Sequence, residues 1–198
     1  QYNQKEYIRS MLSERLKNSI KDYPDFPKKD IIFKDISPIL TNPNLFSDLI
    51  DKLKNYTFFK NTDAIIAIDS RGFIFGSAIA HAIKKPLVLA RKKNKLPGIL
   101  IENSYGLEYG EDKLCIQESA ISPFKKFVII DDLLATGGTA KAVVDMLKDK
   151  KKEILALSVV VELTFLEGSK KLDIPIYSEV KYWNPLILFF SSGIVDLN

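Results

Sequence analysis

The sequence is poor in the residue types on which several classes of site depend. Among its 198 residues there is one cysteine, Cys115, and one histidine, His81. A single cysteine cannot form an internal disulfide bond, which agrees with a reducing compartment. A single histidine inside an apolar stretch favours a structural role for the imidazole over catalysis or metal binding. The composition therefore argues against a disulfide-stabilised fold and against histidine-based chemistry.

Long apolar runs and a strong net charge are also missing. No segment reaches the roughly 20 apolar residues that a membrane-spanning helix requires, and residues 1–10 are too polar for a signal peptide. The net charge of +4 does not require a nucleic-acid surface, although it is compatible with an anionic small-molecule ligand. We expect a soluble, cytoplasmic protein, and the length of 198 residues predicts a single domain over 1–198.

Short runs of branched apolar residues predict buried strands with helices between them. The strands are expected at 64–68, 87–90, 127–130 and 154–161, with a weaker candidate at 174–177. Segments with helical spacing, 72–84 and 139–150, follow the first and third strands. This alternation predicts an α/β fold with a parallel, twisted sheet of about five strands flanked by helices. In such sheets, ligands bind beyond the carboxyl ends of the strands, where the strand order reverses.

Two segments do not fit this alternation. Residues 2–20 carry apolar residues at helical spacing, and the proline-containing segment 23–27 cannot continue a helix. We therefore expect residues 1–40 to form an N-terminal helix that leads into a covering segment. Residues 96–112 contain three glycines among polar residues, and their length predicts a flexible loop that covers a site as a lid.

The segment 131–139, Asp-Asp-Leu-Leu-Ala-Thr-Gly-Gly-Thr, connects the third predicted strand to the second of these helices. Gly137 and Gly138 allow the backbone to approach an anion closely, and the N–H groups at the start of the helix then point toward it. The hydroxyl groups of Thr136 and Thr139 add two donors. The segment is therefore typical of a phosphate-binding turn, and an ordinary strand-to-helix turn capped by Thr139 is the alternative.

Two carboxylates narrow the class of ligand. Asp131 and Asp132 would repel a phosphate ligand unless they accept hydrogen bonds from its hydroxyl groups or share a bridging cation with it. A pentose phosphate accompanied by Mg²⁺ meets both conditions. The sequence contains neither Gly-x-x-x-x-Gly-Lys-[Ser/Thr] nor Gly-x-Gly-x-x-Gly, which argues against the common nucleoside-triphosphatase and dinucleotide sites.

The pattern Asp-Asp-x-x-Ala-Thr-Gly-Gly-Thr resembles the phosphoribosyl-diphosphate signature of the type I phosphoribosyltransferases. The form with Leu133 and Leu134 is similar to that of the adenine phosphoribosyltransferase family. Further blocks, in the family's order from about residue 20 to about residue 180, carry the same resemblance. They are 22–27 with 32–38, 69–76, 91–92 with 95–98, and 105–110.

The resemblance implies an activity and its requirements. The expected fold is that of a type I phosphoribosyltransferase, with residues 1–40 as a purine-covering hood and a flexible lid loop. The expected reaction transfers 5-phosphoribosyl from 5-phosphoribosyl 1-diphosphate to adenine, giving AMP and diphosphate in purine salvage. Mg²⁺ is the expected cofactor, held mainly by the substrate near Asp131 and Asp132. A homodimer is the expected assembly, without nucleic acid or membrane as partner.

The resemblance also assigns the residues that bind the sugar diphosphate. The 5′-phosphate is assigned to Ala135, Thr136, Gly137, Gly138 and Thr139, and the ribose hydroxyls to Asp131 and Asp132. The diphosphate is assigned to Arg71, Arg91 and Lys95. Lys92 and Lys93 would add positive field without direct contact. In similar enzymes, the peptide bond between Asp69 and Ser70 is cis.

The remaining assignments concern the base and the reaction centre. The purine is assigned to Ile32, Phe33 and Lys34, largely through backbone groups, with Leu133 on the opposite face of the ring. The expected catalytic residues are Glu108, Tyr109 and Arg71. Glu108 is expected to take up or redistribute the proton of the attacking purine inside a site closed to water.

Several positions depart from the family pattern. Lys29 and Asp30 stand where Pro-Gly is usual, Lys34 where arginine is common, Ser77 where proline is common, and Asn94 where glycine is common. Lysine cannot replace the planar guanidinium of arginine, so any side-chain role of Lys34 differs from the family's. The residues beyond Tyr182 exceed the family pattern.

Two other functions stay open at this point. A phosphoribosyltransferase for hypoxanthine, guanine or a pyrimidine would keep the same fold, and the segments 32–34 and 133–134 argue against it. A regulator that senses the sugar diphosphate without turnover would need a nucleic-acid-binding module. The short N-terminal segment, with its acidic residues, argues against such a module.

Overall fold

The structure, a computed structural model, describes residues 4–29, 31–107 and 110–183. The chain divides into two units, Gln1–Lys60 and Asn61–Asn198. A single domain over 1–198 with residues 1–40 as its hood stays a prediction. Among the described helices, none is long and apolar enough to cross a membrane.

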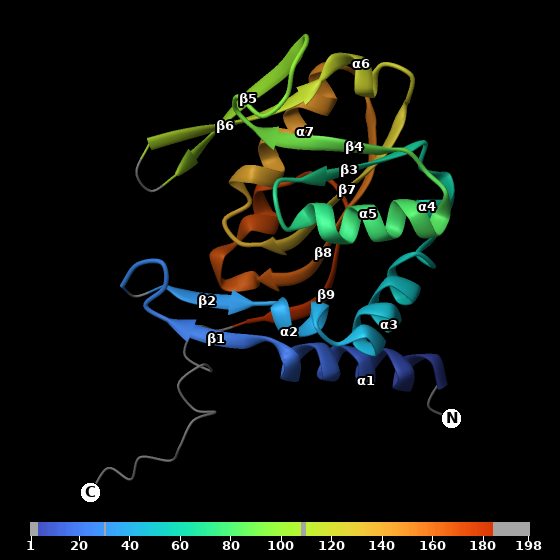
Figure 1. The fold of residues 1–198 in the computed structure, drawn as a ribbon, viewed down its shortest axis with the longest axis vertical. Helices are drawn as coiled ribbons and strands as arrows, with labels where there is room; N and C mark the ends of the chain where they lie inside the picture. Colours follow the sequence, from blue (N-terminus) through green and yellow to red (C-terminus); the bar gives the residue numbers. More distant parts are fainter. Residues whose placement is uncertain (1–3, 30, 108–109, 184–198) are drawn as a thin grey trace, which may run out of the picture. The chain divides into compact units, whose positions relative to one another are not determined.

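The first unit consists of short helices and a two-stranded hairpin (Figure 1). Its elements are α1 Gln4–Ser19, β1 Lys21–Pro24, β2 Ile32–Asp35, α2 Ser37–Leu40, α3 Pro43–Leu53 and α4 Thr57–Asn61, which reaches the boundary. The helix predicted over 2–20 is confirmed as α1. The antiparallel β1–β2 pair, with Asp22 opposite Lys34, was not predicted because strands of four residues carry too little periodicity.

Helix α3 illustrates how local sequence sets an element of this unit. The side chain of Asn42 accepts a hydrogen bond from the N–H of Leu45 at 3.1 Å, and Pro43 occupies the first helical turn. Leu45, Leu49 and Leu53 are spaced four residues apart, and all three are buried. Capping and burial on one face therefore define this helix together.

The second unit is organised around a sheet that, within the described residues, has seven strands in the order β5-β6-β4-β3-β7-β8-β9. The strands are β3 Ala64–Ile68, β4 Leu87–Lys92, β5 Leu100–Leu107, β6 Gly110–Gln117, β7 Lys126–Leu134, β8 Glu153–Leu163 and β9 Ile176–Tyr182. The five strands from β4 to β9 in this order pair in parallel, which confirms the predicted parallel sheet. Strands β5 and β6 extend one edge in antiparallel fashion.

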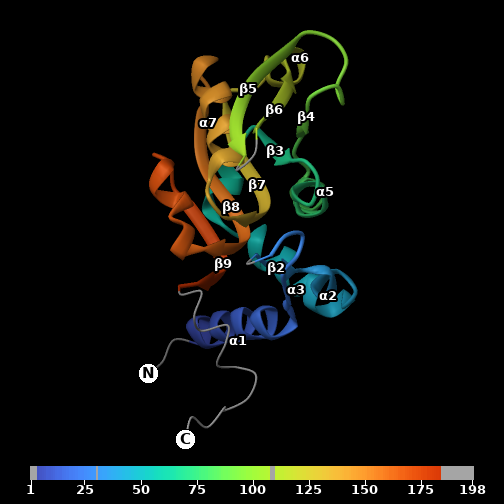
Figure 2. The same cartoon turned by 90° about the vertical axis from the view of Figure 1, so that its left-hand side faces the viewer.

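Helices cover both faces of this sheet. The helices of this unit are α5 Gly72–Ile83, α6 Glu118–Ile121 and α7 Gly138–Asp149, with 3₁₀ turns η1 Thr164–Leu166 and η2 Gly168–Lys171. Figure 2 shows α5 and α7 on opposite sides of the strands. Helix α5 links β3 to β4, whereas α7 links β7 to β8 in the other direction along the sheet. The strand order therefore reverses between β3 and β7, which is where such folds bind ligands.

The core lies between the central strands and the covering helices. All five residues of β3 are buried. Ile129 of β7 and Leu157 of β8 belong to the same apolar cluster as Val143 and Leu147 of α7. The sole histidine, His81, is exposed on α5, so it has no part in this core.

Two parts of the second unit differ from the sequence-based expectation. We predicted a long loop over 96–112, but residues 100–107 form β5 and residue 110 begins β6. Cross-strand pairing in this hairpin, such as Ile101 opposite Ile116, outweighs the loop-like composition of the segment. Strands β4 and β7 also continue past their predicted ends, to Lys92 and Leu134. Residues expected in loops after these strands therefore have strand geometry.

The packing of α5 on β3 yields a first prediction. A Cβ atom at Gly76 would lie 2.5 Å from the Cβ of Ala67, so the backbone of the helix packs directly on the side chain of Ala67 in β3. Gly76→Ala should lower the free energy of unfolding by about 1–3 kcal/mol despite alanine's higher helix propensity, because the two elements must move apart. Urea titration followed by circular dichroism measures this change.

The exposed neighbour Ser77 provides the control for Gly76. Ser77→Ala should change the free energy of unfolding by less than about 0.5 kcal/mol. If Gly76→Ala is as stable as the wild type, the close helix–strand contact does not limit the packing.

Candidate active site

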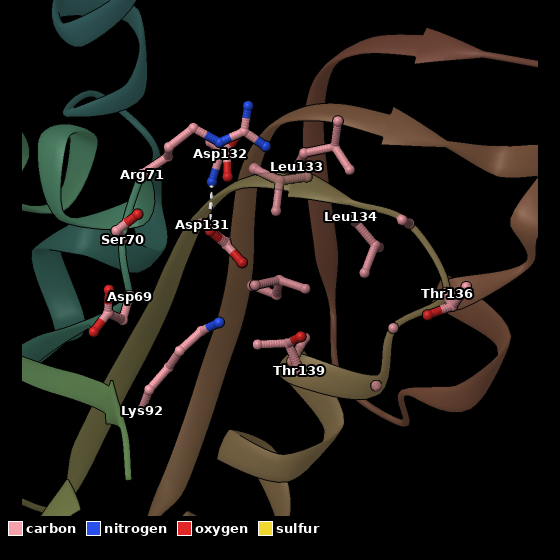
Figure 3. Close-up of a pocket in the computed structure, with 16 residues that line it drawn as sticks. Asp69, Ser70, Arg71, Lys92, Asp131, Asp132, Leu133, Leu134, Thr136 and Thr139 are labelled. Atoms are coloured by element: carbon pink, nitrogen blue, oxygen red, sulfur yellow. Dashed lines mark hydrogen bonds and ion pairs between the residues drawn. The ribbon is translucent and has the colours of Figure 1, made fainter. Parts of the chain in front are cut away.

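A pocket of about 390 Å³ opens where β3, β7 and α7 meet (Figure 3). It lies beyond the carboxyl ends of β3 and β7, at the reversal of strand order, as the sequence predicted. Its lining comes from three polar segments that sequence analysis identified and from β8. The lining residues are Asp69, Ser70, Arg71, Lys92, residues 131–140, Leu157 and Val159. The peptide bond between Asp69 and Ser70 is cis, as the resemblance implied.

The turn between β7 and α7 has the geometry of an anion-binding helix start. Gly137 is the N-cap of α7, with a φ of 79°, and no side chain caps the helix. The alternative of a helix capped by the hydroxyl of Thr139 is therefore wrong. The first N–H groups of an α-helix have no partner within the helix, and here they lie at the pocket. Together with the positive end of the helix dipole, they form a site for a phosphate group.

Asp131 and Asp132 lie beside this turn within β7. The backbone N–H of Asp132 donates to Oδ1 of Asp131 at 2.8 Å. The Nε of Arg71, at the end of the turn after β3, lies 3.0 Å from Oδ2 of Asp132 in an ion pair. Asp132 is only 5% exposed. The end of β7 and the turn after β3 thus bring two carboxylates and one guanidinium together, and Figure 3 shows them grouped at one side of the pocket.

Burial of this carboxylate pair changes its acidity. Loss of hydration raises the pKa of Asp131 well above its ordinary value, and the neighbouring charge of Asp132 raises it further. Burial also raises the pKa of Asp132, while Arg71 opposes that shift. Both aspartates therefore hold protons more tightly in the folded protein than in an unfolded chain.

The carboxylate pair suits a cation carried by a ligand better than a resident metal ion. Within the described part of the chain, no group of three or more metal-ligating side chains is found. The buried Oδ2 of Asp132 accepts no aligned hydrogen bond from the described residues, although Arg71 lies beside it. An oxygen of this kind can accept a hydrogen bond from a ligand hydroxyl or from a water molecule bound to Mg²⁺.

Three basic side chains in and after β4 occupy different positions relative to the pocket. Nε of Arg91 lies 3.1 Å from Oδ2 of Asp69, and its guanidinium lies over the ring of Phe73. Arg91 and Lys95, to which the diphosphate was assigned, are not among the lining residues, whereas Lys92 is. Figure 3 shows the amino group of Lys92 pointing toward Asp131 and Thr139.

Strand alternation explains the position of Lys92. Side chains two residues apart lie on the same face of a strand, so Lys92 shares its face with Val88 and Ala90, which belong to the cluster that packs on α7. Our prediction ended this strand at residue 90, so the alternation was not extended to Lys92. Leu157 and Val159 of β8 were also missed as lining residues, because burial in a strand gives no sign of an open pocket.

The expected purine-binding residues belong to the first unit. Ile32, Phe33 and Lys34 form most of β2, and Leu133, expected on the other face of the purine, lines the pocket of the second unit. Lys34 Nζ donates to both oxygens of Asp22 at 2.6 and 2.7 Å. Burial lowers the pKa of Lys34, and the hydrogen bond that its amino group donates to Asp22 opposes this shift. Lys34 therefore has a structural role inside the hairpin.

The proposed catalytic residues of the lid, Glu108 and Tyr109, lie outside the described residues. Their roles stay predictions.

Known proteins agree with this geometry. A profile of the phosphoribosyl transferase domain family matches residues 35–181. Over 172 residues the chain is 54% identical to adenine phosphoribosyltransferase of Prochlorococcus marinus (strain MIT 9215). The matched region covers 87% of this chain and 100% of that protein. The chain belongs to the adenine phosphoribosyltransferase family. The resemblance inferred from the motifs is confirmed.

Solved structures of adenine phosphoribosyltransferases share the fold. The enzyme of Saccharomyces cerevisiae, complexed with D-2,5-dideoxy-2,5-imino-altritol 1,6-bisphosphate and adenine, is 38% identical with a TM-score of 0.81, covering 86% of this chain and 99% of that one. The enzyme of Thermoanaerobacter pseudethanolicus is 40% identical with a TM-score of 0.81 and the same coverage of both chains. The chain therefore has the type I phosphoribosyltransferase fold and belongs to a family of pentosyltransferases.

The raised pKa values of the carboxylate pair predict how stability depends on pH. Such a carboxyl group has a higher pKa in the folded protein than its value of about 4 in the unfolded chain. Its contribution to stability is complete at pH values below the unfolded pKa and is lost as the pH rises through the folded pKa. Asp131→Asn removes the charge of this half-buried side chain and keeps the acceptor for the N–H of Asp132. It should be about 0.5–2 kcal/mol more stable than the wild type at pH 7, and equal to it below about pH 4.

Urea unfolding of Asp131→Asn and wild type across this pH range measures the difference. Asp149→Asn, an exposed position on the last turn of α7, serves as the control and should stay within about 0.5 kcal/mol of the wild type. A loss of stability in Asp131→Asn at pH 7 would show that the ionised carboxylate is favourable in the free protein.

Proposed function

We propose that the chain transfers the 5-phosphoribosyl group of 5-phosphoribosyl 1-diphosphate to adenine, giving AMP and diphosphate, with Mg²⁺ as cofactor. One observation carries the proposal most directly. A helix start suited to a phosphate group and the carboxylate pair of Asp131 and Asp132 line the same pocket, beside Arg71. A ligand with a phosphate group and a diol, such as a ribose phosphate, matches both features.

Different pocket residues bind different parts of the sugar diphosphate. Backbone N–H groups of residues 135–139, with the hydroxyls of Thr136 and Thr139, hold the 5′-phosphate. Asp131 and Asp132 accept hydrogen bonds from the ribose hydroxyls and fix the orientation of the ring. Arg71 and Lys92 line the same pocket and offset the charge of the diphosphate, and Arg91 and Lys95 add to the positive field.

The reaction needs charge stabilisation more than proton transfer. A purine nitrogen forms a bond to the anomeric carbon while the bond from that carbon to the diphosphate oxygen breaks, so positive charge develops on the sugar ring. Ionised carboxylates at Asp131 and Asp132 stabilise this charge, and the cationic side chains stabilise the departing diphosphate. Mg²⁺, when bound with the substrate, supplies further positive charge to the diphosphate oxygens. Positioning and electrostatics thus supply most of the rate.

The base and the lid complete the proposal. Ile32 and Phe33 bind adenine with the backbone of Lys34, and Leu133 supplies an apolar wall. Glu108 takes up or redistributes the proton of the attacking purine, and Tyr109 closes over the reaction centre. The family resemblance supports these roles, as well as a homodimer and a cytoplasmic location.

The activity is testable with purified protein. Adenine, 5-phosphoribosyl 1-diphosphate and Mg²⁺ should give AMP, measured by liquid chromatography, and EDTA should abolish the reaction. With adenine, hypoxanthine, guanine and a pyrimidine base competing in one tube, AMP should be the main product. A different nucleotide would reassign the base. Binding of the sugar diphosphate without turnover, together with salt-dependent DNA binding, would support a regulator instead.

The role of Glu108 is a separate prediction. Glu108→Gln should lower kcat by about a hundredfold or more while the KM values for both substrates change little, because proton transfer is lost and binding is kept. Steady-state kinetics measures this split, with Glu102→Gln on β5 as the control for a charge lost from the same hairpin. Full turnover in Glu108→Gln would rule out a catalytic carboxylate at this position.

A further inference from the structure

A segment that does not line the pocket lies directly behind its phosphate turn. After β8 the chain forms the 3₁₀ turn η1, passes through Glu167 in a left-handed conformation with a φ of 55°, and begins η2 at Gly168. Gly168 is buried but is absent from the residues that line the pocket. The atoms nearest to it belong to the phosphate turn, residues 135–137.

The backbones of Gly168 and the phosphate turn are in direct contact. A Cβ atom at Gly168 would lie nearest the carbonyl oxygen of Ala135, 2.8 Å from the backbone nitrogen of Gly137 and 3.0 Å from the carbonyl carbon of Ala135. In the reverse direction, a Cβ atom at Gly137 would lie 2.5 Å from the carbonyl oxygen of Gly168. Real Cβ atoms do not approach other atoms so closely, so neither position has room for a side chain.

The two glycines are required for different reasons. Gly137 has a φ of 79°, which other residues adopt only with strain, in addition to its close contact. Gly168 is not among the residues with positive φ, so its backbone conformation is open to any residue. Space alone therefore demands glycine at 168, and the space is limited by the turn that faces the phosphate site.

The segment behind the turn is anchored on both sides. Oγ1 of Thr164 donates to the carbonyl oxygen of Tyr182 on β9 at 2.7 Å. Leu172 is buried in the same apolar cluster as residues of α7. Lys148 at the end of α7 forms an ion pair with Asp173. The position of Gly168 is thus set by the sheet and by α7, independently of any ligand.

We propose that Gly168 is a positioning residue for phosphate binding. Its backbone supports residues 135–137 from behind and holds the N–H groups at the start of α7 in the orientation that a phosphate group requires. Any side chain at 168 pushes the turn toward the pocket. The inference rests on the proposed function, since it assigns the turn to the 5′-phosphate of the substrate.

The variant Gly168→Ala tests the proposal, with Ser169→Ala as the matched control in the same 3₁₀ turn. Gly168→Ala should raise KM for 5-phosphoribosyl 1-diphosphate by about tenfold or more, because sub-ångström displacement of a binding group is costly. KM for adenine should stay within about twofold, and Ser169→Ala should match the wild type in both constants. An unchanged KM for the sugar diphosphate in a folded Gly168→Ala protein overturns the proposal. An equal rise for both substrates also overturns it, because it indicates general disruption.

Hydrogen–deuterium exchange of the wild-type protein provides a measurement that does not depend on the folding of a variant. Ribose 5-phosphate should slow exchange in residues 135–140 and also in residues 164–170, although the latter do not line the pocket. Residues 143–149 of α7 serve as the internal reference and should be unaffected. Protection of the turn without protection of 164–170 contradicts the proposed support.

Failure of the proposed function gives a different result from failure of this inference. If ribose 5-phosphate protects both segments of the wild type but no AMP forms, the positioning role of Gly168 is supported and the proposed transferase activity is wrong. If the wild type forms AMP and Gly168→Ala retains its KM for the sugar diphosphate, the transferase activity is confirmed and the positioning role of Gly168 is wrong.

Discussion

Two neighbouring carboxylates, the half-buried Asp131 and the buried Asp132, share the carboxyl end of β7, and the rest of the site is arranged around this constraint. Asp132 is paired with Arg71 and donates its N–H to Asp131, and burial raises the pKa of both groups. A carboxylate pair that is poorly hydrated and has one cationic partner is unfavourable in the free protein. Ribose hydroxyls and a cation carried by the substrate would relieve that cost, so the free protein is prepared for this ligand at the expense of its own stability.

The backbone is packed unusually closely around the same strand end. A Cβ atom at Gly72 would lie 2.9 Å from the carbonyl oxygen of Ile130 and 3.0 Å from Oδ1 of Asp131. Gly137 and Gly168 are in similarly close contact in and behind the phosphate turn. Close contact of this kind leaves little freedom for the carboxylates and the phosphate turn, and preorganised groups lose less free energy when they bind a ligand.

Local patterns predicted much of the second unit. Strand β3 was predicted at its exact bounds, and α5 and α7 within one residue of their ends, because buried strands and amphipathic helices have clear periodicities. The β1–β2 and β5–β6 hairpins were not predicted, since their strands are stabilised by cross-strand partners that a single segment does not reveal. The ends of β4 and β7 were placed too early for the same reason: pairing with neighbouring strands extends them past the apolar run.

The chemical class of the ligand follows from a short stretch of local sequence. A turn with two glycines, two threonines and two preceding carboxylates suits a ribose phosphate wherever it lies, because these groups are adjacent in the chain. The distant residues that join these groups are selected by the folding of the chain. It places Lys92 in the pocket and pairs Arg91 with Asp69, and it brings Gly168 behind the turn. These contacts, and the raised pKa values that follow from burial, depend on long-range packing, which has no counterpart in local sequence patterns.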